Sequence, residues 1–407
     1  MFRRPPLRLA GPAVVASVAY VDPGNVATNV TAGSEYGYAL VWVVVLASVM
    51  AVPVQYVSAR VGVVTGRSLP QACRSRMSRA ARVVMWLQAE VVAMATDVAE
   101  FLGAAVGLHL LFGIGLLPSG LITAVVAFAV LGLQRRGHRP FEVGVGAFLA
   151  LVVAGFAYQL VAVGIDAGAV ARGLVPGFPA TPTDAGSSAL VVAVGIVGAT
   201  VMPHAIYAHS ALTAGRSRTA GPEGRGRLLR FQRTEVVAAL SLAGLVNLAM
   251  LLVAAGLSTR SGAPVIDGLE AAHAELAATI GGTAALAFAA ALLASGLSSA
   301  AVGTYSGQIV MEGFVDVRLP ILLRRVVTML PALVLLAVGA DPTAALVGSQ
   351  VVLSFGIPFA LYALVRVARD GDLLGREAIG FPMRIVLGAV STVVVGLNAV
   401  LIVDVLR

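Results

Sequence analysis

The chain has 407 residues, of which 58% are hydrophobic and only 12% charged, whereas a soluble globular domain carries about 25% charged residues. This composition excludes a water-soluble protein, and the lack of a long polar stretch excludes a soluble domain on a single anchor. All 28 basic residues are arginine and the net charge is +8; in a membrane protein this excess predicts contact with the anionic inner leaflet rather than nucleic acid. The single cysteine, Cys73, excludes internal disulfides and cysteine-rich metal sites.

The apolar runs, taken in chain order, predict eleven transmembrane helices. Each run has roughly the 20 residues that a helix needs to cross a bilayer core, and arginine, proline or glycine bounds it. The predicted spans are 10–31, 38–60, 83–111, 117–134, 141–165, 187–212, 234–257, 278–303, 320–339, 344–366 and 384–405. Arginines precede the first run, as they do in a secretory signal, but no clean cleavage site follows, so we interpret the run as a span.

The positions of arginine predict which ends of the spans are cytoplasmic. With the N-terminus inside, 25 of the 28 arginines fall in cytoplasmic segments, and only Arg172, Arg260 and Arg407 fall outside. Cytoplasmic loops retain positive charge, so this split favours an odd number of spans, a cytoplasmic N-terminus and an extracellular C-terminus. We expect a multi-pass protein of the cell membrane, with a flexible Gly- and Pro-containing linker at 213–232.

The spans divide into two halves and one additional helix, all within a single transmembrane domain, 1–407. We place the division in the outer loop at 166–186. The first repeat of five helices then covers 10–165 and the second covers 187–366, with 384–405 as helix eleven. An odd number of spans in each half inverts the halves relative to each other, a symmetry found in many secondary transporters.

The first and the sixth spans are each interrupted in mid-run. The first contains Asp-Pro-Gly-Asn at 22–25, and the sixth contains Ala-Thr-Val-Met-Pro-His at 199–204. Proline removes a backbone donor and glycine lets the chain leave helical geometry, so both helices are expected to unwind there. Matching interruptions in two inverted halves indicate a substrate site at the bilayer midplane.

The residues at the interruptions predict a transition-metal cation as the substrate. Asp22 offers a carboxylate, Asn25 an amide oxygen, and the freed carbonyls near Ala19 and Ala199 offer further oxygens. Oxygen ligands alone suit Mg2+ or Ca2+, whereas the thioether of Met202 favours metals such as Mn2+ and Fe2+. The alternative for Met202 is ordinary packing. We favour the ligand interpretation because Met202 lies opposite an acid that is costly to place inside a membrane.

The third span carries three acids, Glu90, Asp97 and Glu100, on one face of a single helix. A row of acids inside the membrane is typical of a proton relay. In the ninth span, Arg324 and Arg325 lie at a depth close to that of Glu90, and we expect them to pair with the acids. The alternative is that both arginines extend to the inner interface.

The histidines are not expected to bind the metal. His204 follows Met202 by two residues, and we assign it to proton transfer or gating near the site, with plain packing as the alternative. We expect His209 to hydrogen-bond between helices, and His109 and His138 to lie near helix ends without partners. The remaining acids near span ends are expected to contact solvent, arginine or a helix N-terminus: Glu142, Glu312 and Asp316.

Five separated motifs resemble those of the NRAMP divalent-metal transporters. They are Asp-Pro-Gly-Asn at 22–25, Thr-Asp-Val-Ala-Glu-Phe-Leu-Gly at 96–103, Met-Pro-His at 202–204, Gly-Gln-Ile-Val-Met-Glu-Gly-Phe at 307–314 and Ser-Gln-Val-Val-Leu-Ser-Phe-Gly at 349–356. The resemblance covers essentially the whole chain and is strongest to the bacterial proton-coupled manganese transporters. It implies an all-α integral membrane protein of the LeuT-type fold, with eleven transmembrane helices, two inverted five-helix repeats and broken first and sixth helices.

The resemblance also implies roles for particular residues. The implied metal ligands are Asp22, Asn25, Met202 and the Ala199 carbonyl, with the Ala19 carbonyl and Gln350 joining in some conformations. The implied proton pathway uses acids and arginines, which here are Glu90, Asp97, Glu100, Arg324 and Arg325. We add His204 to this pathway because of its position beside the metal site and not because of the resemblance. One departure is Ala205, where the family often has asparagine, but every expected ligand is present.

Together these features predict proton-coupled import of divalent transition metals by alternating access, with the metal bound between the unwound parts of helices one and six. The expected partners are the metal, protons and the lipid bilayer, without nucleic acid, and the expected state is a monomer. No metalloprotease or serine-hydrolase motif is present, so we expect neither an enzyme nor a resident cofactor. A channel fits paired broken helices less well. The alternative is a sodium-coupled amino-acid transporter of the same fold, in which Asp22 would repel the substrate carboxylate unless an amine paired with Asp22.

Overall fold

The computed structural model describes residues 11–134, 138–180, 187–261 and 266–406 of the chain. All regular secondary structure in these residues is helical. The N-terminal arginines, together with Arg135 and Arg136 of the loop between the fourth and fifth predicted spans, lie outside the described residues.

The first predicted span consists of two short helices, α1 (Pro12–Ala19) and α2 (Pro23–Tyr36), so its interruption lies where the sequence predicts it. The other long helices of the first half are α3 (Val41–Thr65), α5 (Arg79–Phe112), α6 (Leu116–Gln134) and α7 (His138–Val163). Two short helices that the sequence did not predict lie in the connecting loops, α4 (Leu69–Arg74) and α8 (Ala167–Gly173).

The sixth predicted span is also divided, into α9 (Ala189–Thr200) and α10 (Pro203–Ser261). Helix α10 continues into the seventh span, because the backbone stays helical through 213–232. The prediction of a flexible linker there is therefore wrong. Glycine and proline weaken a helix without forbidding it, and the apolar parts of this region remain separate, at Ala189–Arg216 and Gly224–Arg260.

The remaining helices follow the predicted order. They are α11 (Gly268–Thr279), α12 (Gly282–Val315), α13 (Ile321–Ala337), α14 (Pro342–Ala368), α15 (Gly371–Leu374), the 3-10 turn η2 (Gly375–Glu377) and α16 (Phe381–Val405). Helix α11 lies in the connection between the seventh and eighth spans and is an addition to the predicted elements.

Eight helices in the described residues are long and apolar enough to cross a membrane. They correspond to the second, third, fifth, sixth, seventh, eighth, tenth and eleventh predicted spans. The other three fall outside this set for different reasons. The first is divided into α1 and α2, the described side chains of α6 end at Ala129, and α13 has 17 residues. The chain is thus a multi-pass membrane protein, and the count of eleven spans remains a prediction.

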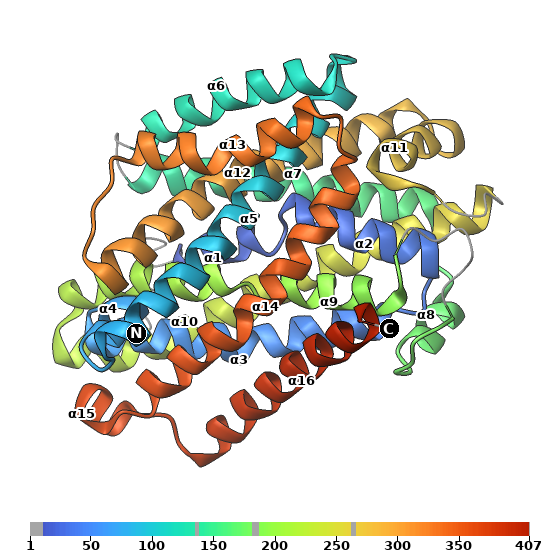
Figure 1. The fold of residues 1–407 in the computed structure, drawn as a ribbon. Helices are drawn as coiled ribbons and strands as arrows, with labels where there is room; N and C mark the ends of the chain where they lie inside the picture. Colours follow the sequence, from blue (N-terminus) through green and yellow to red (C-terminus); the bar gives the residue numbers. More distant parts are fainter. Residues whose placement is uncertain (1–10, 135–137, 181–186, 262–265, 407) are drawn as a thin grey trace, which may run out of the picture.

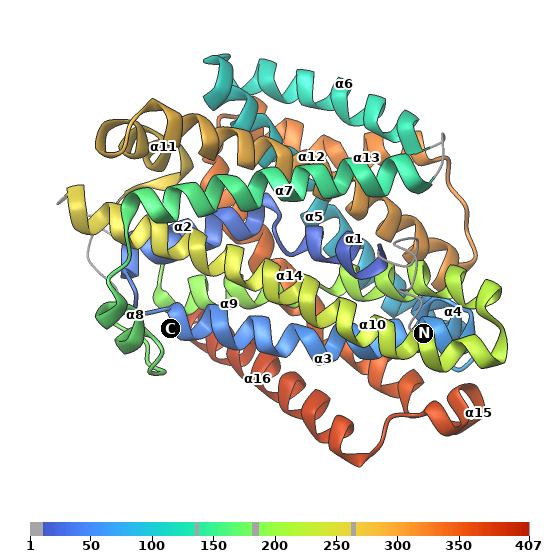
Figure 2. The same cartoon turned by 180° about the vertical axis from the view of Figure 1, so that it is seen from behind.

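The long helices form a bundle that surrounds the interrupted helices α1, α2 and α9 (Figure 1). Every residue of α2 except Glu35 is buried. Helix α1 begins at the end of the bundle that holds α4 and α15, whereas α16 ends at the opposite end, beside α8, as Figure 2 also shows. Three ion pairs join the predicted cytoplasmic segments at the α4 end: Arg60–Glu377, Arg74–Asp316 and Arg76–Asp370.

Two glycines allow other helices to approach the interruptions closely. A Cβ on Gly103 of α5 would lie 1.9 Å from the Cβ of Pro23, and a Cβ on Gly198 of α9 would lie 2.0 Å from the carbonyl oxygen of Gln350. Any side chain at either position would collide with these atoms. The glycines therefore let α5 and α14 pack directly against the interrupted helices.

Candidate metal site and proton pathway

Both interruptions free a backbone carbonyl for the same reason. In an α-helix, the carbonyl of each residue accepts a hydrogen bond from the N–H four residues later. The residues four positions after Ala19 and Ala199 are Pro23 and Pro203, and proline has no N–H. Ala19 and Ala199 are both buried, at 1% and 0% exposure. The two predicted carbonyl ligands are thus buried oxygens without a helical donor.

Asp22 caps the start of α2 and fixes the position of Asn25. Its Oδ1 accepts hydrogen bonds from the backbone N–H of Asn25, at 2.8 Å, and from the Asn25 side-chain Nδ2, at 2.7 Å. Its Oδ2 is buried and has no hydrogen-bond partner in the described structure. Leaving a buried polar atom unsatisfied costs about 1–3 kcal/mol, and more if it is charged. A cation at this position would remove that cost.

Asn25 connects the two interruptions. Its Nδ2 also donates a hydrogen bond to the Ala199 carbonyl, at 2.8 Å, so that Asp22, Asn25 and Ala199 form one buried cluster. Its Oδ1 has no partner among the described residues. The amide NH2 lies between a carboxylate oxygen and a carbonyl oxygen. A cation in that place would contact both oxygens, and a turned Asn25 amide would add a third.

Gln350 and Met202 are both fully buried. Gln350 lies against Gly24, where a Cβ would be 1.9 Å from Gln350 Nε2, and its Oε1 has no partner in the described part of the chain. Met202 and Ala19 belong to the same buried cluster of apolar side chains. The structure therefore joins Asp22, Asn25 and the Ala199 carbonyl through hydrogen bonds and places Gln350 against the neighbouring Gly24 and Gly198. Met202 and Ala19 are buried in one large apolar cluster, and no hydrogen bond joins them to these three residues in the described structure.

The cluster at the interruptions contains a single acidic side chain, Asp22. Among the described residues, no group of three or more His, Cys, Asp or Glu side chains could hold a metal ion. The cluster at the interruptions offers one carboxylate, with amide and carbonyl groups as neutral donors. A single carboxylate leaves a divalent cation with net positive charge, which suits an ion that binds and then leaves.

Polar side chains that the sequence analysis missed hold the unwound part of the first span. Asn247 Nδ2 donates to the carbonyl of Tyr20, at 2.9 Å, and the Ser295 hydroxyl donates to the carbonyl of Val21, at 2.6 Å. Both come from other helices, α10 and α12, and both are buried. An isolated asparagine within an apolar run was a usable signal, because a polar group inside a membrane needs a partner.

The histidines outside the interruptions have local structural contacts. His209 Nδ1 lies 2.9 Å from Gln55 Oε1 and so joins α10 to α3, as expected. The expectation that His109 lacks a partner is wrong, because it contacts a backbone carbonyl at the end of α5 and lies 3.7 Å from Glu270. The chain folds α11 back over this helix end, which the spacing of the histidine did not reveal. The side chain of His138 lies outside the described residues, as does that of Glu142.

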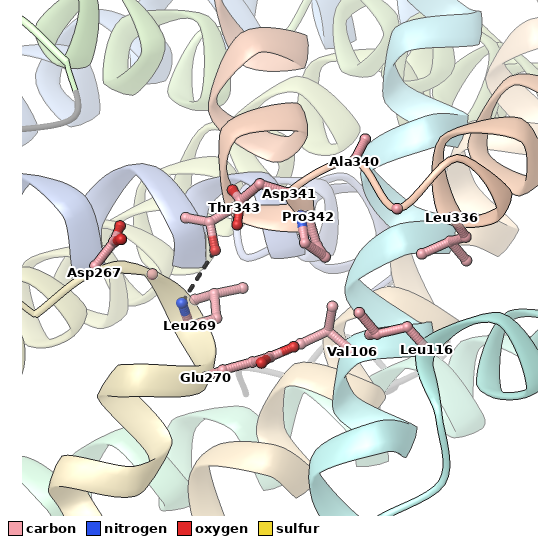
Figure 3. A pocket seen from close by; sticks show the side chains of 12 residues that line it. Val106, Leu116, Asp267, Leu269, Glu270, Leu336, Ala340, Asp341, Pro342 and Thr343 are labelled. Carbon is pink, nitrogen blue, oxygen red and sulfur yellow. Dashed lines mark hydrogen bonds between the residues drawn. The ribbon is translucent and has the colours of Figure 1, made fainter.

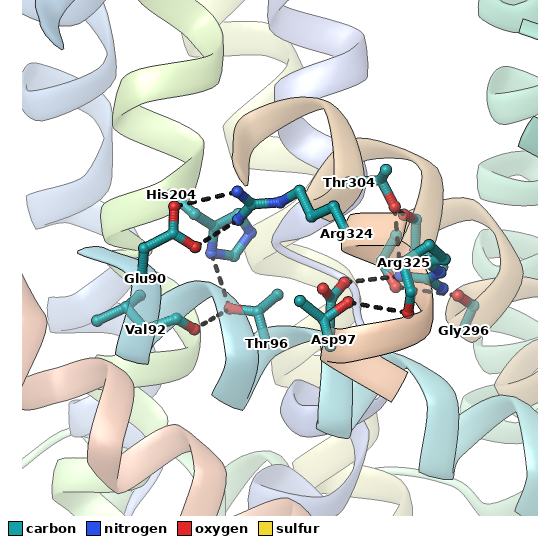
Figure 4. A network of polar contacts seen from close by, with 12 residues as sticks. Glu90, Val92, Thr96, Asp97, His204, Gly296, Thr304, Arg324 and Arg325 are labelled. Carbon is teal, nitrogen blue, oxygen red and sulfur yellow. Dashed lines mark hydrogen bonds and ion pairs between the residues drawn. The ribbon is translucent and has the colours of Figure 1, made fainter. Parts of the chain in front are cut away.

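Two ion pairs join α5 to α13 (Figure 4). Arg324 donates two hydrogen bonds to the Glu90 carboxylate, at 3.0 and 2.8 Å. Arg325 donates to Asp97 at 2.7 Å and to the Thr304 hydroxyl at 3.2 Å. The side chains of Arg325 and Asp97 are only 2% and 4% exposed. These arginines therefore point into the protein rather than toward the inner interface.

Glu100 lies one helical turn beyond Asp97 and forms no ion pair with any residue that the structure describes. Both of its carboxylate oxygens are buried without a hydrogen-bond partner in the described structure. A Cβ on Gly303 of α12 would be 2.6 Å from Glu100 Oε2, so this acid faces α12. Glu100 can therefore exchange a proton without breaking an ion pair.

His204 lies between the second interruption and the row of acids. Its Nδ1 is 3.2 Å from the hydroxyl of Thr96, the residue before Asp97 (Figure 4). Its backbone carbonyl accepts a hydrogen bond from the Ser306 hydroxyl at 2.7 Å. Its Nε2 has no partner within the described residues. Thr96 was not predicted as part of the site. It connects α5 to a residue two positions from Met202.

A separate pocket of about 330 Å3 lies at the end of the bundle that holds α11 (Figure 3). Three acids, Asp267, Glu270 and Asp341, contribute to its lining, and Asp341 caps α14 through the N–H of Ala344. None of the predicted metal or proton-pathway residues lines this pocket. It is therefore distinct from the cluster at the interruptions.

Comparison with known proteins places the chain in a family. A family model described as "Natural resistance-associated macrophage protein-like" matches residues 13–404. The chain belongs to the NRAMP family. The divalent metal cation transporter MntH of Deinococcus radiodurans is 44% identical over 396 residues, which cover 97% of this chain and 89% of that protein. The divalent metal cation transporter MntH of Bacillus subtilis is 43% identical over 402 residues, covering 98% and 93%.

Solved structures agree with this NRAMP assignment. The crystal structure of a mutant of the Eremococcus coleocola manganese transporter matches with a TM-score of 0.81 at 31% identity, covering 96% of this chain and 86% of that one. Mhp1, a nucleobase-cation-symport-1 family transporter, shares the fold alone, with a TM-score of 0.55 at 15% identity over 95% and 92% of the chains. The predicted LeuT-type fold class is confirmed, and the NRAMP chain is a membrane transporter and not an enzyme. The repeat boundaries remain predictions.

Proposed function

We propose that this NRAMP protein imports divalent transition-metal ions such as Mn2+ and Fe2+ and couples their import to protons. The observation that carries this proposal is the buried cluster of Asp22, Asn25 and the Ala199 carbonyl, in which carboxylate and amide oxygens lack partners within the described residues. The names of the relatives, divalent metal cation transporter and manganese transporter, support a metal rather than an amino acid as the substrate.

The donor set supports selectivity for transition metals. Asp22 supplies charge, Asn25, Gln350 and the backbone carbonyls supply neutral oxygens, and Met202 supplies a thioether. Hard ions such as Ca2+ and Mg2+ gain little from sulfur, whereas Mn2+ and Fe2+ tolerate it better. We therefore assign discrimination to Met202 and binding energy to the oxygen donors. The metal is the transported substrate, and we propose no resident cofactor.

The interruptions support transport by alternating access. Each divides a span into two helices that meet at the ligand cluster, so one part can tilt while the ligands stay near the midplane. We place the protein in the cell membrane as a monomer, with a cytoplasmic N-terminus and an extracellular C-terminus. On this orientation the α4 end of the bundle faces the cytoplasm.

The row of acids supports a separate route for protons. Helix α5 begins at Arg79, at the α4 end, so Glu90 lies nearer the cytoplasm than Asp97. We propose that protons pass from Asp97 to Glu90, each held by its arginine, and that His204 links Asp97 to the metal site through Thr96. Glu100 supplies or receives protons on the outer side of Asp97.

Proteoliposomes loaded with a pH-sensitive dye test the coupling. Addition of Mn2+ is expected to drive proton entry in the wild type, and Asp97→Asn is expected to abolish metal-driven proton entry. Asp22→Asn is expected to abolish both metal uptake and the accompanying proton flux. Asp267→Asn, in the pocket near α11, is the matched control and should behave as wild type. Undiminished coupling in Asp97→Asn would contradict the proposed proton route.

A further inference from the structure

An apolar groove of about 480 Å3 runs between the start of α5 and the later part of α14. Its walls include Met77, Ala81 and Met85 on the α5 side and Pro358, Phe359 and Tyr362 on the α14 side. Phe359 is 42% exposed and Tyr362 is 61% exposed. These helices begin and end at the α4 end of the bundle, beside α15 (Figure 1). The groove therefore opens sideways toward lipid, close to one membrane interface.

Arginines without acidic partners lie at the same end of the groove. Arg366, in the last turn of α14, and Arg369, the C-cap residue of α14, follow Tyr362 by four and seven residues, so the three share one face. On α5, Arg79 and Arg82 lie within the first turns and flank Ala81. None of these four arginines forms an ion pair within the described residues.

The acids nearest to these four arginines are already paired with another arginine, so they do not neutralise them. The acids that follow α14, Asp370 and Asp372, both pair with Arg76. The Nε of Arg82 is buried and has no hydrogen-bond partner in the described structure. The first turn of the 34-residue helix α5 adds backbone N–H groups and a positive dipole end at the same place. The groove thus has apolar walls and, at the α4 end of the bundle, positive groups that can bind an anion.

We propose that this groove binds one anionic phospholipid of the cytoplasmic leaflet. The phosphate would contact Arg82 and Arg366, and an acyl chain would lie along Ala81 and Phe359. Basic pockets between transmembrane helices on the cytoplasmic side recognise anionic headgroups, and a zwitterionic lipid would place its own ammonium beside the arginines. The bound lipid bridges α5, which carries the paired acids, and α14, which carries Gln350.

Native mass spectrometry of the purified full-length protein tests this binding without any transport measurement. The protein is incubated with phosphatidylglycerol or with phosphatidylcholine of the same acyl chains. The wild type is expected to retain one phosphatidylglycerol and to prefer it to phosphatidylcholine. Each arginine near an anionic headgroup contributes about fivefold in affinity. The double variant Arg82→Gln/Arg366→Gln is therefore expected to bind phosphatidylglycerol about 30-fold more weakly.

Two further variants separate the charge from the groove. Arg227→Gln/Arg376→Gln, on α10 and η2, removes the same charge from exposed positions and should retain the lipid. Ala81→Leu fills the groove without changing charge and is expected to lower retention. Equal retention of the two lipids by the wild type would overturn the proposal, as would wild-type retention by either the Arg82/Arg366 variant or Ala81→Leu. If the double arginine variant does not fold, the lipid comparison and Ala81→Leu still decide the question.

Discussion

Replacing Asp97 with asparagine is expected to destabilise the protein by about 3–5 kcal/mol, because it leaves the buried Arg325 guanidinium without a countercharge. The new amide oxygen and the Thr304 hydroxyl can still accept hydrogen bonds, but both are neutral. Unit charges about 4 Å apart attract by about 4 kcal/mol at an effective dielectric constant of about 20. Burying each ion costs several kcal/mol. The intact pair is therefore close to neutral for stability, and the large cost appears when one partner is removed.

A double-mutant cycle measures this coupling. Asp97→Asn, Arg325→Met and the double variant are compared with the wild type by chemical unfolding in detergent micelles. We expect each single variant to lose about 3–5 kcal/mol and the double variant to lose much less than their sum. The exposed pair Arg76–Asp372 is the control, and its coupling should stay below about 1 kcal/mol. Equal coupling in the two pairs would refute the burial argument.

Three further outcomes follow from local packing and titration. Gly103→Ala forces a Cβ against Pro23 and is expected to lower the free energy of unfolding by about 1–3 kcal/mol. Gly388→Ala has open space around it and should not destabilise α16. Equal effects of the two variants would contradict the close packing of α5 against Pro23. Burial raises the pKa of the Cys73 thiol to about 12, so maleimide should label it at neutral pH only after unfolding, and rapid labelling of folded protein would be inconsistent with this. Burial lowers the pKa of His273 below its ordinary value of 6.5, and the neighbouring His109 lowers it further. The folded state therefore favours the neutral imidazole, so α11 keeps its full stability above about pH 6.5 and loses stability as the pH falls. Hydrogen exchange of 268–279 should show that loss in the wild type and less of it in His273→Gln.

The interruptions and the paired charges could be predicted from the sequence because their causes are local. Pro23 and Pro203 remove an N–H whatever surrounds them, so the breaks and the freed carbonyls follow directly. The pairing of Arg324 with Glu90 followed from equal depths in two spans. Depth is set by distance along each helix, and the membrane makes an unpaired arginine costly.

Other features depend on which helices pack together, and a single sequence does not contain that information. The hydrogen bonds from Asn247 and Ser295 to the unwound backbone come from helices far along the chain. The link between Thr96 and His204 needs α5 and α10 to meet at one level. Helix α11, with its Ala- and Glu-containing face, lacks the apolar length that identifies a span. Its contact with His109 was therefore unforeseen.

Competition between metals tests the central claim most directly. Mn2+ uptake into proteoliposomes is measured with increasing Ca2+ for the wild type, Met202→Ala and the control Met50→Ala, which removes a buried methionine from a different packing cluster. Met202→Ala is expected to lower the preference for Mn2+ over Ca2+ by about tenfold or more, about 1.4 kcal/mol, while Met50→Ala keeps it. An unchanged preference in Met202→Ala, or no Mn2+ uptake by the wild type, would contradict a transition-metal site at the two interruptions.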